Sequence, residues 1–257
     1  VRAMDADYRF AGLYDLRLRV SELSELVHVN EYLYSEVETD TRKSGEKLFD
    51  YVDPKNRAVQ IEMESVCTAY LKRVGGYLAP GFEPISFDID GFEQEASVII
   101  PVRNRIRTIE DAIRSVLMQE TTFRFNLIIV DNHSTDGTSE AIEKYTADKR
   151  VIHLIPERFD LGIGGCWNVG VHHPACGKFA VQLDSDDVYS GPDTLQKIVN
   201  AFYEQNCAMV VGTYRMTDFK MNEIPPGIID HREWTPDNGR NNALRINGLG
   251  APRAFYT

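Results

Sequence analysis

The chain has 257 residues, enough for one large domain or for one domain with an appended segment. Hydrophobic residues make up 43% and charged residues 26%, which are ordinary globular values and exclude wholesale disorder. The formal net charge of -11 disfavours a nucleic-acid backbone or an anionic membrane as the main partner, because both would be repelled on average. Phosphate can still bind where cations, helix N-termini or a metal converge on one pocket.

The sequence contains no recognisable signal for export or membrane insertion. No apolar run approaches the roughly 18 residues needed to span a bilayer, and residues 1–5 lack the basic-then-apolar pattern of a secretory signal. The four cysteines show no CxxC spacing, which indicates reduced thiols. We therefore expect a cytoplasmic protein, or one that is peripheral at the inner face of the membrane. Both ends of the chain look like cuts from a longer sequence, so a signal or an anchor beyond them stays open.

Residues 1–94 predict an extension and linker that is mostly helical. Residues 59–78 carry apolar side chains at helical spacing, and the Gly75-Gly76 pair would end this amphipathic helix. The other segments are less regular: residues 14–20 fit a helix or a strand, residues 27–34 are mixed and apolar, residues 40–56 are a polar loop, and residues 80–91 connect to the next domain.

Residues 95–257 predict an α/β domain, because apolar strands alternate with helices. Such strands form a mainly parallel sheet, and ligands bind at the carboxyl ends of its strands. Asp131 and Asp184 each follow a predicted strand, which is the first indication of a site. The predicted strands are 97–101, 127–130, 151–155, 179–183 and 208–212; the predicted helices are 108–117, one carrying Ala141, Ile142 and Tyr145, a short one at 166–171, and 193–205.

Small polar residues precede two of the predicted helices. Thr108 can cap the first, with Asp111 three positions on as an acidic partner. Ser134 and Thr135 are candidate caps for the second. For Ser134, Thr135 and Asp136, capping is at least as strong an interpretation as ligand binding.

The central chemical signal is Leu183-Asp184-Ser185-Asp186-Asp187, directly after a strand. Mg²⁺ and Mn²⁺ prefer oxygen ligands and leave coordination sites for water and substrate phosphates. Two carboxylates with one residue between them can hold such an ion beside a diphosphate and stabilise the charge that develops when the diphosphate leaves. The alternative is that Asp186 or Asp187 caps the following helix, and a D-x-D motif alone is weak evidence.

Two further segments follow the first two strands. Pro101-Val102-Arg103-Asn104 follows one, and Val130-Asp131 continues to Thr138 after the other. A carboxylate such as that of Asp131 can accept a hydrogen bond from the imino N–H of a pyrimidine base. Arg103 or Arg105 could stack on the base or pair with phosphate.

Together these segments resemble the family 2 glycosyltransferases, which have the GT-A fold. The matching pieces are residues 97–104, 128–138, 162–168 and 183–187, in the same order and at the same spacing. The resemblance covers residues 95–257 and implies a nucleotide site and a metal site. The residues implied at the nucleotide are Pro101, Arg103, Asn104, Asp131, Asn168, Asp184 and Ser185; those implied at the metal are Asp186 and Asp184.

Some positions depart from the family pattern. Many members have an aromatic residue where this chain has Val102-Arg103, which disfavours base stacking by that route. Asn168 could equally make a local helix contact. The glycine-rich segment that faces the acceptor in the family matches residues 247–253, with Gly248, Gly250 and Arg253 on the acceptor side.

The catalytic base is expected outside the chain. In the family an acidic pair follows the acceptor segment, and this chain stops at Thr257, so no base can be assigned and the fragment's activity is in doubt. Residues 14–34 resemble the tail of the same family without its acidic residue. They are either the end of a preceding glycosyltransferase-like domain or part of a helical adaptor.

The resemblance implies metal-dependent, inverting transfer of a hexose in polysaccharide biosynthesis. The donor would be a nucleotide sugar, most simply a UDP-sugar, with Mn²⁺ or Mg²⁺ as the cofactor. The acceptor would be a hydroxyl group of a glycan or a lipid. The alternatives are a sugar-nucleotide-binding module without turnover and a nucleotidyltransferase. A dinucleotide site at residues 162–167 is disfavoured by Trp167 at the third glycine position, and a zinc site at Cys166, His172, His173 and Cys176 matches no common spacing.

Overall fold

The computed structural model describes residues 7–35, 57–79, 81, 83–88, 91–230 and 252–257. The chain divides into two compact units, each described by itself below. One comprises Glu83–Gly212 and Gly250–Thr257, and the other Val1–Phe82 and Thr213–Leu249. The domain boundary that the sequence predicts between residues 94 and 95 stays a prediction.

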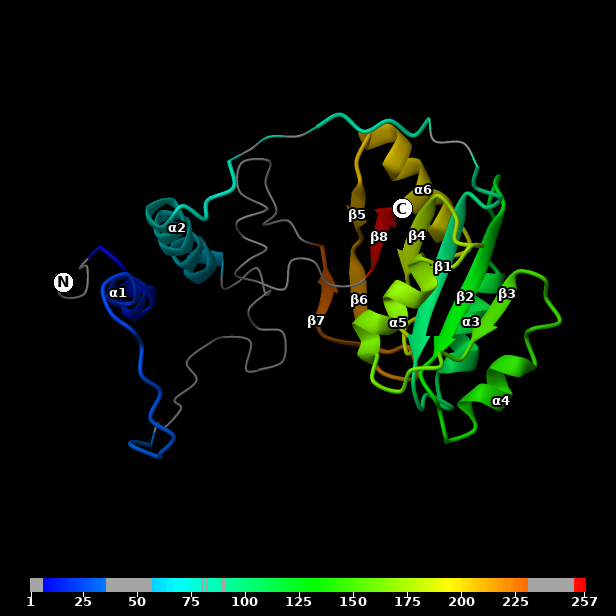
Figure 1. The fold of residues 1–257 in the computed structure, drawn as a ribbon, viewed down its shortest axis with the longest axis horizontal. Helices are drawn as coiled ribbons and strands as arrows, with labels where there is room; N and C mark the ends of the chain where they lie inside the picture. The colour runs from blue at the N-terminus through cyan, green and yellow to red at the C-terminus, as the bar shows by residue number, and fades with distance from the viewer. Residues whose placement is uncertain (1–6, 36–56, 80, 82, 89–90, 231–251) are drawn as a thin grey trace. The chain divides into compact units, whose positions relative to one another are not determined.

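The first unit is built on a mixed, mainly parallel six-stranded sheet with strand order β3-β2-β1-β4-β8-β5 (Figure 1). β1 pairs in parallel with β2 and β4, and β2 pairs in parallel with β3. β8 is antiparallel to both of its neighbours, β4 and β5. This confirms the predicted α/β fold class. The strands are β1 (Ala96–Val102), β2 (Phe125–Asp131), β3 (Val151–Leu154), β4 (Phe179–Gln182), β5 (Met209–Val211) and β8 (Arg253–Tyr256).

Helices cover both faces of this sheet. Alternate strand residues point to opposite faces, so Ile100 and Leu127 pack in one apolar cluster while Ile99 and Ile128 pack in another. α3 (Ile109–Leu117), α4 (Thr138–Glu143) and α6 (Thr194–Gln205) contribute to the first cluster. α5 (Gly162–Val171) contributes Cys166 to the second. The predicted apolar stripe of α3 is confirmed, since Ile109, Ala112, Ile113 and Val116 are all fully buried.

The helix starts differ from the sequence prediction in one place. α4 begins after Gly137, which adopts a left-handed backbone with a φ of 98°, so the predicted caps Ser134 and Thr135 are wrong. Both residues instead contact the loop after β1, about thirty positions away in sequence. Thr108 does occupy the position before α3, but its side chain makes no capping hydrogen bond.

The second unit contains α1 (Gly12–Ser21), α2 (Arg57–Val74) and the hairpin of β6 (Tyr214–Thr217) and β7 (Glu223–Ile229). Glu62 of α2 accepts backbone N–H groups from Arg9, Phe10 and Ala11, and so satisfies the start of α1. The amphipathic helix predicted at residues 59–78 is observed as α2, whereas the hairpin was not predicted. The polar stretch 40–56 lies outside the described residues. None of the helices in the described part of the chain is both long and apolar enough to cross a membrane.

Candidate functional site

The predicted site residues gather at the carboxyl ends of three adjacent strands. β1 lies between β2 and β4, and the last β1 residue, Val102, is in register with Asp131 at the end of β2. Asp184 lies two residues beyond the end of β4. Parallel pairing thus places the three loops that follow these strands along one edge of the sheet, where α/β proteins bind their ligands.

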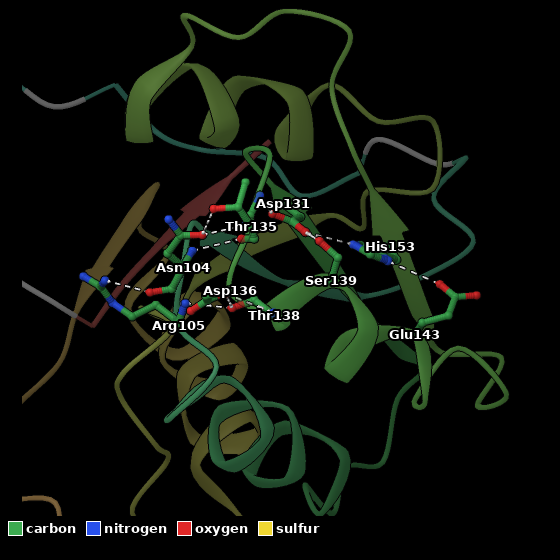
Figure 2. Close-up of polar contacts among 10 residues, drawn as sticks. Asn104, Arg105, Asp131, Thr135, Asp136, Thr138, Ser139, Glu143 and His153 are labelled. Carbon is green, nitrogen blue, oxygen red and sulfur yellow. Dashed lines mark hydrogen bonds and ion pairs between the residues drawn. The ribbon is translucent and has the colours of Figure 1, made fainter.

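The loops after β1 and β2 are joined by a network of hydrogen bonds (Figure 2). Asn104, which has a φ of 54°, donates its backbone N–H to Ser134 Oγ at 2.9 Å. Its side-chain oxygen accepts the N–H of Thr135 at 2.7 Å. Asn104 therefore fixes the β1 loop against the β2 loop, and this contact explains why an asparagine with a left-handed backbone suits the position.

Asp136 and Thr138 make a second set of contacts between the same loops. The backbone N–H of Arg105 donates to Thr138 Oγ1 at 2.8 Å, and that of Ile106 donates to Asp136 Oδ2 at 3.2 Å. The hydroxyl of Thr138, and after it the backbone N–H groups of Ile106 and Thr138, lower the pKa of Asp136. Asp136 Oδ1 also accepts the backbone N–H of Thr138, the first residue of α4, at 3.1 Å. Asp136 therefore serves the start of the helix, as the capping interpretation expects, and also orders the site loops (Figure 2).

Asp131 is fully buried and its carboxylate has interior partners. Ser134 donates its backbone N–H at 2.9 Å, the Ser139 hydroxyl donates to Oδ2, and His153 Nε2 lies 3.6 Å from Oδ2 (Figure 2). Burial raises the pKa of Asp131, but these partners outweigh burial and hold the pKa well below its ordinary value. Asp131 in turn raises the pKa of His153. The predicted contact of Asp131 with the nucleoside stays a prediction.

Asn132 is a site residue that the sequence analysis missed. It follows Asp131 and is 7% exposed, and its side-chain Oδ1 is buried with no hydrogen-bond partner among the described residues. A buried carbonyl oxygen without a partner costs free energy unless a ligand or water completes it. The alternation of side chains along a strand could have identified it, because a residue next to an inward-facing one points the other way.

The residues of the D-x-D motif differ in exposure and partners. Ser185 is buried, whereas Asp184 is partly exposed and accepts a hydrogen bond from Gln182 Nε2 at 2.7 Å. The side chain of Asp186 is 49% exposed, and its carboxylate lies 3.7 Å from Arg105 Nε. The ion pair brings a cation from the β1 loop to the carboxylates of the β4 loop.

The carboxyl group of Asp187 has a raised pKa. The residue is exposed, but dense protein around the carboxyl group, and then the charges of Asp184 and Asp186, raise its pKa to about 6. Three carboxylates within four residues would repel a diphosphate unless a cation neutralised them. The negative charge of this loop therefore suits a site in which a bound cation neutralises the carboxylates.

The donor set fits a divalent cation held jointly with a substrate. Among the residues that the structure describes, no three His, Cys, Asp or Glu side chains form a group that could hold a metal. A closed, all-protein metal site is therefore not present in this part of the chain. Mg²⁺ and Mn²⁺ sites in phosphate chemistry commonly use one or two carboxylates and take the remaining ligands from phosphates and water, and Asp184 with Asp186 match that pattern.

The remaining predicted residues lie around the same edge or beyond it. Pro101 is buried within β1, and Arg103 is exposed in the loop that follows. Asn168 is exposed on α5, where its backbone carbonyl accepts a hydrogen bond from the His172 ring. Arg253 opens β8 and donates to Gln182 Oε1 at 2.7 Å. Gly248 and Gly250 lie outside the described residues.

The structure also bears on the two disfavoured sites, the dinucleotide motif at residues 162–167 and the zinc site that includes Cys166 and Cys176. Trp167, which stands at the third glycine position of the disfavoured dinucleotide motif, packs against the apolar cluster under α5, and its ring centroid lies 6.4 Å from that of Phe255 in an edge-on contact. Cys166 and Cys176 are buried free thiols, and burial raises the pKa of both. A raised thiol pKa disfavours the thiolate that zinc requires.

The comparisons with known proteins identify the family. The model for glycosyl transferase family 2 matches residues 97–254. The chain belongs to this family. An uncharacterized glycosyltransferase of Rickettsia felis is 39% identical over 97 residues, which cover 38% of this chain and 15% of the relative. The GalNAc(5)-diNAcBac-PP-undecaprenol beta-1,3-glucosyltransferase of Campylobacter jejuni is 32% identical over 111 residues, covering 42% of this chain and 35% of the relative.

A solved structure is also similar to this family 2 chain. The crystal structure of Staphylococcus aureus TarS 1–349 in complex with UDP-GlcNAc has a TM-score of 0.43 and 27% sequence identity, and the match covers 51% of this chain and 37% of that one. The family 2 chain spans well under half the length of each of these relatives. The family that the motifs predict is confirmed.

Proposed function

We propose that this chain carries the donor site of a metal-dependent, inverting glycosyltransferase. The donor is a nucleotide sugar, with UDP as the nucleotide, and the acceptor is a hydroxyl group of a glycan or of a lipid-linked saccharide. The observation that carries the proposal is the meeting of the β1, β2 and β4 loops at one sheet edge, where Arg105 faces Asp186. Family membership and the lipid-linked substrate in the name of the Campylobacter relative support it.

The donor site uses side chains from all three loops. We assign Asp186 and Asp184 to a divalent cation, which when bound would neutralise the diphosphate leaving group. Arg105, and with it Arg103, offers positive charge to the phosphates. We assign the orphan oxygen of Asn132 to an N–H group of the base, because it is buried with no hydrogen-bond partner among the described residues.

Asp131 has a different part in this proposal. Its carboxylate is engaged by Ser134 and Ser139 and faces His153, so it holds the β2 loop rather than offering a free oxygen. We propose that Asp131 acts on the nucleoside by fixing the backbone that presents Asn132. We also assign Pro101, Asn104, Asn168 and Ser185 to the wall of the site.

The transfer itself needs three events at the anomeric carbon. The acceptor hydroxyl enters from the side of Arg253, loses its proton to a base, and forms the new bond to carbon as the bond to the diphosphate oxygen breaks. The electron pair of that bond leaves with the diphosphate, and attack from the opposite side inverts the configuration. We assign the base to none of the described residues.

Calorimetric titration tests the proposed donor site. The chain is titrated with UDP and with GDP, each with Mn²⁺ and with a chelator, and the titrations are repeated for Asp186→Ala. Wild type is expected to bind one nucleotide only when metal is present, and Asp186→Ala should weaken that binding by about 10- to 100-fold. Glu204→Ala is the matched control, since it removes an exposed carboxylate next to Tyr203, whose hydroxyl contacts Glu95 ahead of β1 at the opposite sheet edge.

Two outcomes would contradict the proposal. Folded wild type that binds neither nucleotide with Mn²⁺ would remove the donor site. Nucleotide binding that is equally strong in chelator and in Asp186→Ala would leave a nucleotide site but remove the metal from it. Transfer of sugar to a lipid-linked acceptor, followed by product analysis, then separates an enzyme from a binding module.

A further inference from the structure

Gln182 is a buried polar residue between two charged groups of the site. It is the last residue of β4 and is 2% exposed. Its Oε1 accepts a hydrogen bond from Arg253 Nε at 2.7 Å, and its Nε2 donates one to Asp184 Oδ1 at 2.7 Å. A single amide therefore connects the strand on the proposed acceptor side with an aspartate of the proposed donor site.

The backbone sets both of these contacts. Val181 is paired with Ala254 in the antiparallel β4–β8 ladder, so Gln182 and Arg253 are the next cross-strand neighbours along it. Alternation along the chain places residues 180, 182 and 184 on one face, and Ala180 packs in the apolar cluster under α5. Gln182 and Asp184 thus share that face, two positions apart.

The amide has only one orientation that satisfies both partners. A guanidinium group donates hydrogen bonds and accepts none, so the carbonyl end of Gln182 must face Arg253. The NH₂ end then necessarily faces Asp184, whose carboxylate only accepts. Asp184 Oδ1 is thereby taken, while Oδ2 has no hydrogen-bond partner in the part of the chain that the structure describes.

This arrangement is not required for packing. A methionine or leucine would fill the space beside the apolar cluster without needing two polar partners, because burying an amide costs free energy unless both ends are satisfied. Here both ends meet charged groups, and hydrogen bonds to charged groups are the stronger kind. The role of the amide is therefore to bind Arg253 and Asp184, and not to fill space.

We propose that Gln182 is a positioning residue: held by Arg253, it fixes the side chain of Asp184 so that Oδ2 alone faces the donor site. The proposal rests on the donor site proposed above and adds a cause for the geometry of its first aspartate. Arg253 then influences donor affinity through Gln182 and not by touching the nucleotide.

Affinity and stability are measured together in four variants. Gln182→Met removes both hydrogen bonds at similar volume, Arg253→Met frees the amide to rotate, the double variant combines them, and Gln196→Met is the control. Gln196 lies partly exposed on α6, and its side chain bonds only Thr122 and Asn200 among the described residues. Each protein is titrated with UDP in saturating Mn²⁺ and melted in the absence of ligand.

We expect Gln182→Met to bind UDP about 10-fold more weakly and Arg253→Met about 3-fold more weakly, with melting temperatures within about 5 °C of wild type. The double variant should match Gln182→Met alone, because Arg253 acts only through the amide. Gln196→Met should bind as wild type does. Losses that multiply in the double variant, or a Gln182→Met affinity within twofold of wild type, would overturn the proposal.

A second readout needs no nucleotide. The ¹³C resonance of the Asp184 carboxyl group should move in Gln182→Met and in Arg253→Met, and should stay in place in Gln196→Met. An unmoved Asp184 resonance in both variants would overturn the proposal even if wild type binds no nucleotide. Failure of wild type to bind UDP with Mn²⁺ would instead count against the donor site itself, so the two failures are distinguishable.

Discussion

Replacing His153 with glutamine would remove the imidazole that faces the buried carboxylate of Asp131. The two groups are 3.6 Å apart, and their side chains are 9% and 0% exposed. Breaking a buried ion pair by removing one partner costs about 3–5 kcal/mol. Asp131 keeps its hydrogen bonds from Ser134 and Ser139, so we expect a smaller loss of about 2 kcal/mol in the free energy of unfolding. For a unit of this size that corresponds to a fall of about 4–8 °C in melting temperature.

The pH dependence of that loss follows from the directions of the two pKa shifts. The raised pKa of His153 contributes stability that is complete below the unfolded value of about 6.5 and is lost as pH rises through the folded value. The lowered pKa of Asp131 contributes stability that is present above about pH 4 and is lost as pH falls through the folded value. The effect of His153→Gln should therefore be largest between about pH 4 and pH 6.5 and shrink at higher pH.

Urea unfolding at several pH values measures this effect directly. Wild type, His153→Gln and the control His172→Gln are compared from pH 5 to pH 9. His172 is an exposed histidine at the C-terminal end of α5, and its ring contacts the backbone carbonyl of Asn168 and no carboxylate among the described residues. A difference between wild type and His153→Gln that stays constant across this range would refute the ion pair as the cause. A loss of equal size in His172→Gln would do the same.

Two further predictions concern the site loop and the packing of α5. Asp187→Asn, measured in chelator, should raise the melting temperature at pH 8 and leave it unchanged at pH 4. The reason is that a folded pKa of about 6 makes ionisation of Asp187 destabilise the fold as pH rises. Equal melting temperatures of wild type and variant at pH 8 would contradict this prediction. Gly170→Ala should lower the free energy of unfolding by about 1–3 kcal/mol, because the added Cβ would lie 2.6 Å from Ile99 Cγ2. Gly164→Ala, which meets nothing within 4 Å, should be neutral or stabilising by up to about 1 kcal/mol, and chemical denaturation compares the pair.

Local patterns were sufficient to predict most of the first unit. Apolar runs of four or five residues predicted β1, β2, β3 and β4, because buried parallel strands are apolar on both faces. The amphipathic stripe predicted α3, because a helix that covers a sheet buries only one of its faces. Features that depend on distant partners were not predictable in this way. β8 has only four residues, Arg253–Tyr256, and its place between β4 and β5 comes from pairing with strands far away in sequence.

The candidate site, too, was predictable only where local sequence patterns decide the structure. The strand-end positions of Asp131 and Asp184 follow from the chain pattern, since each comes directly after an apolar strand. The direction of each side chain does not follow, and Asp131 proves to face His153, twenty-two positions on, within the protein. Ser134 and Thr135 look like helix caps by type, but their contacts with Asn104 depend on how two loops meet. The pairing of Gln182 with Arg253 likewise depends on β8.

Paramagnetic broadening by Mn²⁺ in the presence of UDP tests the central claim most directly. With backbone amides assigned, the account predicts that signals of Asn104, Asn132 and residues 184–187 disappear first, while Gly177 at the opposite edge of the sheet stays sharp. It also predicts that UDP with Mg²⁺, which is not paramagnetic, shifts the same signals without broadening them. Broadening centred on another part of the chain, or none at saturating UDP and Mn²⁺, would contradict a metal-nucleotide site at the carboxyl ends of β1, β2 and β4.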